Sequence, residues 1–515
     1  MSNLYFFTGQ IYITFLKFVY LCAEKIKKNM IFSVFAQKIA EKLPFSPNKT
    51  QVEALNLLGE FLFGQTSGYG SALSADKVFV LRGYAGTGKT SIVGALVKLL
   101  FEHKIPVMLM APTGRAAKVF SSMAGLPAYT IHKSIYRQQK FSVEMDNFQL
   151  TENRRHGALF ICDEASMIST LNEGSPFGTG NLLDDLIEYV YASQGCKLLL
   201  VGDAAQLPPV GQKQSPALDV ERLRGYGLQV MTTELTEVAR QQLDSGILYN
   251  ATQLRQLLMA GKVDQLPRIY YKMYSDVLRI DGYELLDALS DSYRREGLDE
   301  TIIITRSNAR ANKFNLGVRN QILEREEELS TGDRLLVVKN NYYWGKEFDN
   351  LPFIANGDVV TVKRVRSTID LYGFRFAKVE VCLPDYDIET EVIIMLDVLT
   401  VDGPSLPQER QQQLFYEVAQ DYPECRNQKD LYKAIKENPY FNALQVKYAY
   451  CVTCHKSQGG QWQDVYLDLG YINPDHLGID FYRWMYTAFT RARQRLYLVN
   501  MSDEMAEDGE GEAEE

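Results

Sequence analysis

An eight-residue segment near the start of the chain, GYAGTGKT at positions 83–90, has the residue types and spacing that chemistry on phosphates requires. It matches the phosphate-loop pattern GxxxxGKT and follows an apolar run at 78–81 that is typical of a buried strand. Glycines let successive N–H groups point at phosphate oxygens, Lys89 can lie beside the β and γ phosphates, and the Thr90 hydroxyl can hold Mg²⁺. The residues predicted to hold a nucleoside triphosphate are Gly83, Tyr84, Ala85, Gly86, Thr87, Gly88, Lys89 and Thr90.

Two adjacent carboxylates, Asp163 and Glu164, follow the apolar run at 158–162. Paired acids after a strand also occur as plain surface turns. After a phosphate loop in the same sheet, however, the first acid is placed to hold Mg²⁺ beside Thr90, and the second to orient or deprotonate the attacking water. We therefore predict Asp163 as a metal ligand and Glu164 as a catalytic residue.

A third polar segment follows the next apolar run, in the sequence LLLVGDAAQLPPV at 198–210. Its Gln206 is an amide at the carboxyl edge of the predicted sheet, where it can report the γ-phosphate. Pro208 and Pro209 stiffen the loop that follows. These observations predict that Gln206 belongs to the same site.

The elements that position these groups alternate between apolar strands and helical stretches, which predicts a parallel sheet covered by helices on both faces. The predicted strands are 77–82, 106–111, 158–163 and 197–202, and the predicted helices are 88–103, 113–124 and 181–192. Residues 141–150 alternate apolar and polar side chains around Asp146 and Asn147, which indicates a tight β-hairpin inserted between the second helix and the third strand.

A second α/β unit is predicted in the C-terminal half, and it is interrupted by a β-rich insertion at about 341–440 that ends in a polar helical stretch. Its predicted elements are a strand at 301–305, a helix at 308–324, and strands at 448–453, 465–469 and 495–499. The chain of 515 residues is long enough for about three or four domains.

The phosphate loop, DEAS at 163–166 and GDAAQLPPV at 202–210 together resemble the superfamily 1 helicases of the RecD-like and Dda-like group, its 5′-to-3′ branch. The resemblance implies an α/β fold with two RecA-like P-loop NTPase domains, a small β-hairpin insertion in the first and an SH3-like β-domain insertion in the second. The implied boundaries are 45–238 for the first domain with its hairpin insertion at about 130–157, 239–340 and 441–500 for the second, and 341–440 for the inserted β-domain.

Further nucleotide contacts are implied by the resemblance alone. Gln51 resembles the glutamine that reads adenine, and Gln206 the glutamine that couples phosphate state to motion. Arg240 and Arg491 resemble arginines that reach the nucleotide from the second domain, so that hydrolysis depends on closure of the two domains. The alternative for each arginine is a charged side chain on the surface of a helix. The resulting catalytic set is Lys89, Glu164, Gln206, Arg240 and Arg491, and Gly459 is added to the nucleotide-binding set.

Contacts to single-stranded DNA are implied by three segments, APTGRAA at 111–117, TIHK at 130–133 and TCHKSQG at 453–459. They offer hydroxyls, a helix N-terminus and basic side chains for backbone phosphates. The predicted DNA-binding residues are Pro112, Thr113, Gly114, Arg115, His132, Lys133, Thr453, His455, Lys456 and Ser457. The hairpin lies where relatives carry a strand-splitting pin, and Phe141 or Phe148 is either the wedge or a core residue.

The overall charge does not itself indicate nucleic-acid binding. The formal net charge is −9, and the last fifteen residues carry eight carboxylates, so the rest of the chain sums to only −1. A nucleic-acid surface therefore needs a local basic groove. The segment 501–515, with this acidic composition, is predicted to be a disordered tail.

The seven cysteines form no regular framework, which agrees with a reducing, cytoplasmic location. Cys451, Cys454 and His455 match the CxxCH pattern of haem attachment, and a single CxxC is also compatible with a redox pair or half a zinc site. Because His455 belongs to the helicase-like segment, we expect these to be structural strand cysteines.

The first 44 residues form an extension whose role the sequence does not give. The apolar run at 4–22 contains Gln10 and Lys17, and it is followed by lysines, so it fits neither a signal peptide nor a membrane span well. We expect no membrane association, and Met30 as the natural first residue.

Taken together, the sequence predicts a monomeric ATP-dependent DNA helicase that uses ATP and Mg²⁺. It would travel 5′-to-3′ on single-stranded DNA and unwind duplex junctions in repair, recombination or replication, together with other repair or recombination proteins. One alternative is a DNA-binding ATPase subunit of a recombination complex that does not unwind, and another is a non-translocating phosphate-loop ATPase or nucleotide kinase. RNA remains open as an additional strand, and we expect no intrinsic nuclease.

Overall fold

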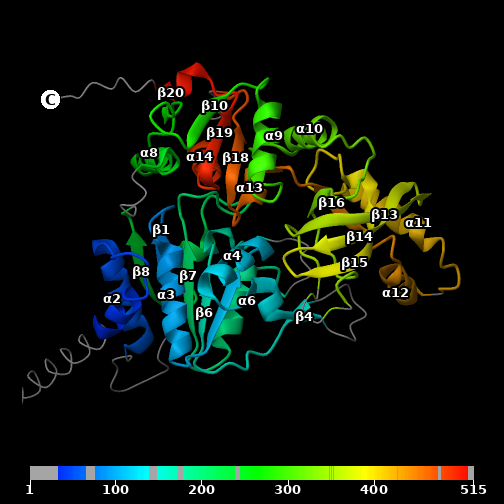
Figure 1. The fold of residues 1–515 in the computed structure, drawn as a ribbon. Helices are drawn as coiled ribbons and strands as arrows, with labels where there is room; N and C mark the ends of the chain where they lie inside the picture. The colour runs from blue at the N-terminus through cyan, green and yellow to red at the C-terminus, as the bar shows by residue number, and fades with distance from the viewer. Residues whose placement is uncertain are drawn as a thin grey trace, which may run out of the picture.

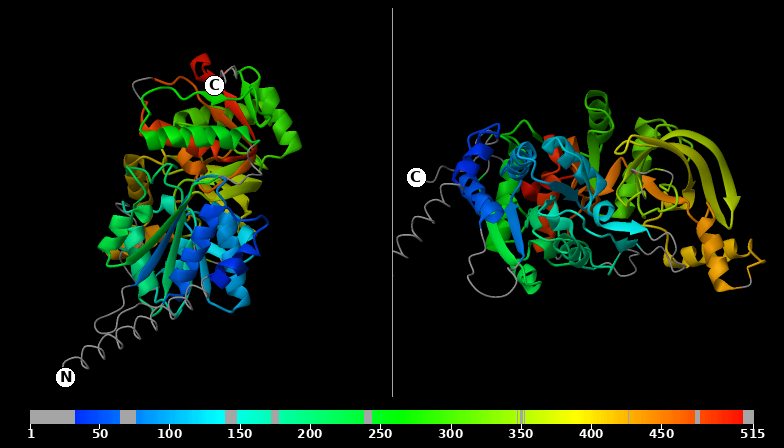
Figure 2. Two further views of the ribbon diagram at one scale, coloured as in Figure 1. Left: turned by 90° about the vertical axis from the view of Figure 1, so that its left-hand side faces the viewer. Right: turned by 90° about the horizontal axis from the view of Figure 1, so that it is seen from below.

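The computed structural model places two α/β domains one above the other, with a β-barrel beside them (Figure 1). It describes residues 33–64, 76–138, 148–171, 178–237, 244–346, 348, 351, 353–425, 427–473 and 477–507. No helix in these ranges combines the length and the apolar character that a bilayer crossing requires. The side view in Figure 2 separates the two domains clearly.

The first domain is built on a six-stranded parallel sheet in the order β3-β2-β6-β7-β1-β8. Its strands are β1 (Lys77–Gly83), β2 (Val107–Ala111), β3 (Ala128–Thr130), β6 (Leu159–Cys162), β7 (Lys197–Gly202) and β8 (Gln229–Leu235). Apart from Lys77, Arg82 and Lys197, the inner strands are apolar and almost fully buried, because helices cover both faces. The α/β class predicted from the alternation over 77–203 is confirmed.

Two groups of helices cover this sheet. One group shares a core with one face, namely α2 (Lys49–Phe63), α3 (Lys89–Glu102) and α4 (Gly114–Ala124). The other shares the opposite core, namely α5 (Ile131–Ile135), α6 (Leu182–Tyr191) and α7 (Val220–Gly225). Side-chain caps fix several starts; Asn48 accepts from Gln51 N, and Thr113 accepts from Ala116 N.

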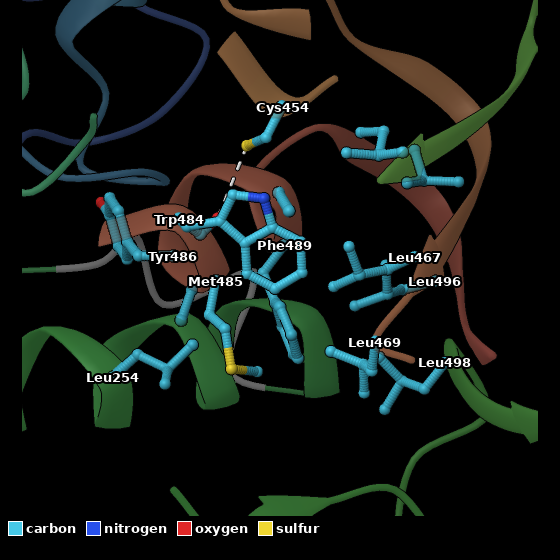
Figure 3. Packing of buried hydrophobic residues seen from close by; sticks show 14 of the residues in the cluster. Leu254, Cys454, Leu467, Leu469, Trp484, Met485, Tyr486, Phe489, Leu496 and Leu498 are labelled. Atoms are coloured by element: carbon cyan, nitrogen blue, oxygen red, sulfur yellow. Dashed lines mark hydrogen bonds between the residues drawn. The ribbon is translucent and has the colours of Figure 1, made fainter. Parts of the chain in front are cut away.

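The second domain has a five-stranded parallel sheet in the order β10-β19-β18-β11-β17. Its strands are β10 (Val277–Ile280), β11 (Thr301–Thr305), β17 (Cys451–Thr453), β18 (Trp462–Asp468) and β19 (Ala492–Val499). Helices α8 (Gly246–Ala260) and α14 (Ile479–Phe489) pack against one face, where Leu254 and Met485 meet Leu467 and Leu498 in one apolar cluster (Figure 3). Helices α9 (Leu285–Arg295) and α10 (Asn308–Gly317) cover the other.

Two boundaries in this domain differ from the prediction. The helix predicted at 308–324 is α-helical only to Gly317 and continues as a π-helical turn, Val318–Ile322, where buried Arg319 forms a bidentate pair with Asp333. The strand predicted at 448–453 is two strands, β16 (Leu444–Tyr448) in the barrel and β17 in the sheet.

The inserted domain is a closed barrel, β12-β13-β14-β15-β16. Its other strands are β12 (Arg334–Val337), β13 (Val359–Leu371), β14 (Phe374–Leu383) and β15 (Ile388–Met395), and α11 (Gln408–Ala419) and α12 (Gln428–Glu437) pack on its outside. The barrel extends beyond 341–440 at both ends, because antiparallel pairing of β12 with β16 closes it.

The small hairpin consists of β4 (Tyr136–Gln138) and β5 (Phe148–Leu150), which pair antiparallel. Its first strand therefore precedes the predicted range 141–150, and the predicted turn and Phe141 lie outside the described residues. Phe148 is buried, with its ring centroid 4.6 Å from that of Tyr342 and 6.1 Å from that of Phe353. Of the two roles considered for Phe148, this position corresponds to core packing.

Both ends of the described chain pack on the domains. Ala36 and Ile39, in a helical segment over 33–40, are buried against α2 and α3, so the core of the first domain includes residues before position 45. The prediction about Met30 lies outside the described residues.

The prediction of a disordered tail over 501–515 is wrong for residues 501–507. Met501 and Met505 are buried in the second domain, and β20 (Ala506–Glu507) pairs with β9 (Ile269–Tyr270). Burial of two methionine side chains orders a segment whose charge alone suggested disorder.

Candidate functional site

A cleft with about 1770 Å³ of open volume lies between the two α/β domains. The first domain contributes the phosphate loop, both predicted acids and the predicted glutamine, and the second contributes residues near the starts of α8 and β19. The charged and polar lining residues are Lys89, Thr90, Ser91, Asp163, Glu164, Gln206, Asp244, Ser245, Ser275, Asp276, Gln461, Thr490, Arg491 and Arg493.

The phosphate loop connects β1 to α3 with the geometry that phosphate binding requires. Gly86 and Gly88 have φ angles of 74° and 85°, a left-handed region that favours glycine. The Lys89 ammonium donates to the carbonyl oxygens of Gly83 and Tyr84 at 2.6 and 3.0 Å, so it lies folded over the loop. Helix α3 begins at Lys89 and directs its N-terminal N–H groups toward the same space.

The two acids lie at the end of β6, facing Lys89 and Thr90 in the cleft. The Glu164 N–H donates to Asp163 Oδ1 at 2.9 Å, and Glu164 has a left-handed φ of 52°. Burial and the neighbouring Glu164 raise the pKa of Asp163 to about 7, while Lys89 opposes the shift. A divalent cation would favour the charged form of this carboxylate, so Asp163 and Thr90 fit a Mg²⁺ ion.

Gln206 follows β7, and its side chain lines the cleft while being only 6% exposed. Its Oε1 atom is buried and has no hydrogen-bond partner among the described residues. A buried oxygen without a hydrogen bond costs folding free energy, so this atom is suited to accept a hydrogen bond from a water or a ligand group in the cleft. The position agrees with the predicted role, which remains a prediction.

Gln51 has another set of contacts. Its Nε2 donates to the Thr87 carbonyl at 2.9 Å, its Oε1 accepts from the Asn48 N–H at 2.9 Å, and the residue is 1% exposed. Gln51 therefore holds the phosphate loop against α2, and reading of adenine by this residue remains a prediction. The sequence analysis missed Phe45, which lines the cleft and gave no motif signal.

The second domain places Arg491 in the cleft, at the end of α14. Its guanidinium is buried and donates to Thr487 O at 3.0 Å, Gly460 O at 3.2 Å and Thr490 Oγ1 at 3.0 Å. Arg240 lies outside the described residues. Gly459 is not among the residues lining the cleft; with a φ of 72° it approaches α4 so closely that a Cβ atom would lie 2.9 Å from that of Ala116.

The predicted DNA-contacting residues of the first domain lie around the starts of α4 and α5. Pro112 precedes the cap residue Thr113, and the Arg115 guanidinium lies 4.0 Å from the centroid of the Trp462 ring. Burial lowers the pKa of Arg115 to about 10 and that of His132 to about 4, so His132 is neutral at pH 7.

The barrel touches this same surface of the first domain. A Cβ atom on Gly114 would lie 2.7 Å from Asp358 Oδ1, and Lys133 lies 5.9 Å from the Tyr386 ring centroid. Lys118 forms an ion pair with Asp385 at 2.9 Å. The starts of α4 and α5 are therefore partly covered by barrel loops.

The predicted DNA-contacting residues of the second domain follow β17 and divide between two cavities. Lys456, in α13 (Cys454–Ser457), meets Thr113 and Arg115 in a pocket of about 500 Å³, and burial with nearby Lys447 lowers its pKa to about 8. His455 instead lines a separate groove, together with Arg306 and Trp484. Thr453 precedes α13, and buried Ser457 donates to Cys454 O at 2.8 Å.

The groove that contains His455 has about 1810 Å³ of open volume and spans both domains. Pro208, Pro209 and Gln212 from the first domain face Arg306 and Trp484 from the second. Arg306 lies 5.4 and 5.5 Å from the ring centroids of Phe481 and Trp484. Cations beside aromatic faces are the groups that bind single-stranded nucleic acids.

The cysteines of the CxxCH pattern are buried in different clusters. Cys451 packs in the cluster between the second domain and the barrel, and Cys454 packs beside α14, where its thiol contacts Trp484 O at 3.5 Å. No group of three or more possible metal ligands occurs among the described residues.

Two family models match parts of the chain. Residues 64–268 match the model described as AAA domain, and residues 448–499 match the model described as UvrD-like helicase C-terminal domain. The first match contains the phosphate loop, both acids and Gln206, and the second contains Arg491 and the segment 453–459.

Relatives cover different lengths of the chain. The ATP-dependent RecD2 DNA helicase of Deinococcus radiodurans is 31% identical over 183 residues, 35% of this chain and 22% of that protein. The ATP-dependent DNA helicase Dda of Enterobacteria phage T4 is 23% identical over 335 residues, 60% of this chain and 68% of that protein. An uncharacterized protein of Methanocaldococcus jannaschii is 23% identical over 470 residues, and the chain spans 37% of its length.

Among solved structures, a Pif1 helicase from Bacteroides is 17% identical, with a TM-score of 0.42 and coverage of 84% of this chain and 91% of that one. The two family models match segments that contain the motifs around the cleft, and two of the relatives are ATP-dependent DNA helicases. Together, these matches support a superfamily 1 helicase similar to the RecD-like and Dda-like group.

Proposed function

We propose that this protein is an ATP-dependent DNA helicase that couples ATP hydrolysis to 5′-to-3′ movement on single-stranded DNA and to unwinding at duplex junctions. The observation that carries the proposal is the cleft itself. The phosphate loop, Asp163, Glu164 and Gln206 from one domain share it with Arg491 from the other. A site divided in this way is completed only when the domains close, which links hydrolysis to domain movement.

In the proposed mechanism, Lys89 leaves the loop carbonyls and binds the β and γ phosphates, and the N-terminus of α3 adds N–H donors. Thr90 and Asp163 would hold Mg²⁺, which neutralises charge on the phosphate oxygens when bound. Glu164 orients the attacking water and accepts its proton, and Arg491 stabilises charge on the transferring phosphoryl group.

The proposed path for the single strand runs over both domains. Basic and aromatic side chains line the groove that contains His455, and Lys456 with Arg115 forms a second basic site close by. Alternate opening and closing of the cleft would move the strand between these sites. We infer the direction of travel and the DNA substrate from the similarity to the RecD-like and Dda-like helicases, and the pathway we propose is repair, recombination or replication.

The test is steady-state ATP hydrolysis by the full chain with and without single-stranded DNA, with single-stranded RNA in parallel, followed by strand displacement on forks with a 5′ or a 3′ tail. We expect strong stimulation by DNA and unwinding of the 5′-tailed fork. Stimulation without displacement would favour the ATPase-subunit alternative. Turnover unaffected by any nucleic acid would overturn the proposal and leave a phosphate-loop ATPase of another kind.

A further inference from the structure

Tyr84, the second residue of the phosphate loop, lies in the apolar core of the other domain. It is 7% exposed and belongs to the cluster formed around α8 and α14. Its hydroxyl donates to Glu234 Oε1 at 2.6 Å, and burial beside this carboxylate raises its pKa. Glu234 belongs to β8 of the first domain, so the Tyr84 ring packs on the second domain while its hydroxyl is bonded to the first.

The partner of the Tyr84 ring is Arg255 of α8. The guanidinium carbon lies 4.1 Å from the ring centroid, and Arg255 is 9% exposed. Its Nε and Nη1 atoms are buried without hydrogen-bond partners among the described residues, and none of the ion pairs found there includes it. A desolvated guanidinium without a carboxylate depends on the aromatic face, which is the condition in which cation–π contacts are strongest.

The next loop residue has a second link to the same domain. The Ala85 N–H donates to the Tyr486 hydroxyl at 2.9 Å, and that hydroxyl donates to Asp203 Oδ2 at 2.7 Å. Tyr486 lies in α14, which packs against α8 through side chains that include Leu254 (Figure 3). Two successive loop residues therefore contact two helices, α8 and α14, that pack against each other.

We propose that Tyr84 and Arg255 are positioning residues that transmit nucleic-acid binding on the second domain to the phosphate loop. The inference rests on the proposed function. When the second domain moves, α8 carries Arg255 and the Tyr84 ring follows, so the loop adopts its hydrolytic geometry only in the closed arrangement. Neither side chain reacts with the nucleotide; each acts through the loop backbone.

The test compares ATP turnover without DNA and with saturating single-stranded DNA, and measures KM for ATP. We expect Arg255→Met to lower the stimulation ratio about tenfold while turnover without DNA and KM change less than about twofold. Arg255→Lys retains a cation and restores part of the ratio. Gln256→Ala, at the exposed neighbouring position in α8, serves as the matched control.

Tyr84 variants test the other half of the contact. Tyr84→Phe keeps the ring and most of the ratio, whereas Tyr84→Leu lowers it as Arg255→Met does. The double variant Tyr84→Leu with Arg255→Met shows no further loss, because both changes remove one contact. If Tyr84→Leu does not fold, as judged by circular dichroism, the Arg255→Met and Arg255→Lys pair decides.

The two proposals fail differently in this experiment. A wild-type enzyme without DNA stimulation overturns the proposed function and the inference with it. A stimulated wild type whose ratio is unchanged by folded Arg255→Met or Tyr84→Leu overturns the inference alone. An equal loss of turnover with and without DNA in Arg255→Met also overturns it, since that is the result of a structural role.

Discussion

The nucleotide cleft and the surface at the start of α4 differ in what already occupies them. In the cleft, Lys89 contacts only loop carbonyls, and the Gln206 oxygen has no partner in the described part of the chain. At the start of α4, Arg115 stacks on Trp462 and Lys118 pairs with Asp385 of the barrel. The cleft has about 1770 Å³ of open volume, and the pocket beside Arg115 about 500 Å³.

This difference indicates that a nucleotide in the cleft and a DNA strand at the start of α4 would have to replace different protein contacts on binding. A nucleotide would replace two hydrogen bonds between Lys89 and loop carbonyls, and contact with Arg491 would replace one or more of the three hydrogen bonds that its guanidinium donates. A DNA strand bound at the start of α4 would exchange protein contacts for phosphate contacts, so we expect its affinity to depend on how tightly the barrel is held.

Lys89→Ala has the largest expected effect. Removal of the ammonium leaves the β and γ phosphates without their closest cation, so we expect ATP turnover to fall at least about a thousandfold while single-stranded DNA still binds. Phosphate release measures ATP turnover, and fluorescence anisotropy measures DNA binding. Lys98→Ala, at an exposed position of α3, is the control and should retain turnover. Full DNA-stimulated activity in the Lys89 variant would overturn the site assignment.

Asp358→Asn tests the barrel contact through its pH dependence. Burial, with Asp385 nearby, raises the pKa of Asp358 from 3.8 to about 7, while the Ala355 N–H, Tyr386 and Lys133 oppose the shift. Because the folded pKa is raised, the stability from this group is complete below about pH 4 and is lost as the pH rises through about 7.

Between pH 5 and 7, we therefore expect the wild type to lose about 2 kcal/mol of unfolding free energy relative to Asp358→Asn. The Asn side chain keeps an oxygen for the Ala355 N–H, which donates to Asp358 at 2.8 Å. Urea unfolding at both pH values measures the difference. Parallel pH dependences of the two proteins would show that the carboxyl is not desolvated by the barrel contact.

Lys456→Gln probes the pocket between the two regions. Its pKa of about 8 leaves the ammonium mostly charged at pH 7, so the variant should lose one phosphate contact. We expect about fivefold weaker binding of single-stranded DNA and a salt dependence reduced by about one counterion. Lys433→Gln, at an exposed position of α12, is the control. An unchanged salt slope would place the strand elsewhere.

The cleft was largely predictable from the sequence, whereas the barrel contact was not. Lys89, Asp163 and Gln206 each follow an apolar strand of one parallel sheet, so local patterns fix where they meet. The change of sheet after β16 was not predicted, because residues 448–453 read as one strand of the second domain, and Gln445 and Lys447 interrupt the apolar residues before it. At the boundary, the distant Asn315 side chain accepts from the N–H groups of Tyr450 and Cys451.

Contacts between domains leave no periodic pattern in the sequence. Two further features were not predicted for this reason. Met505 is a core residue because the segment that contains it packs on the second domain, where β20 pairs with β9. Tyr84 occupies a variable position of the phosphate-loop pattern, so the motif gave it no role beyond the loop, yet its ring meets Arg255 of the other domain.

The smallest expected effect belongs to the ion pair of Lys118 with Asp385. The lysine side chain is 55% exposed and the aspartate 16%, so water and salt screen the attraction. A double-mutant cycle with Lys118→Gln and Asp385→Asn should give a coupling of about 0.5 kcal/mol in unfolding free energy at low salt, and almost none at high salt. Such a small, salt-sensitive coupling would show that the barrel is held to α4 mainly by buried groups such as Asp358. A coupling that persists at high salt would instead show that the pair is desolvated and that the barrel is held to α4 by charge.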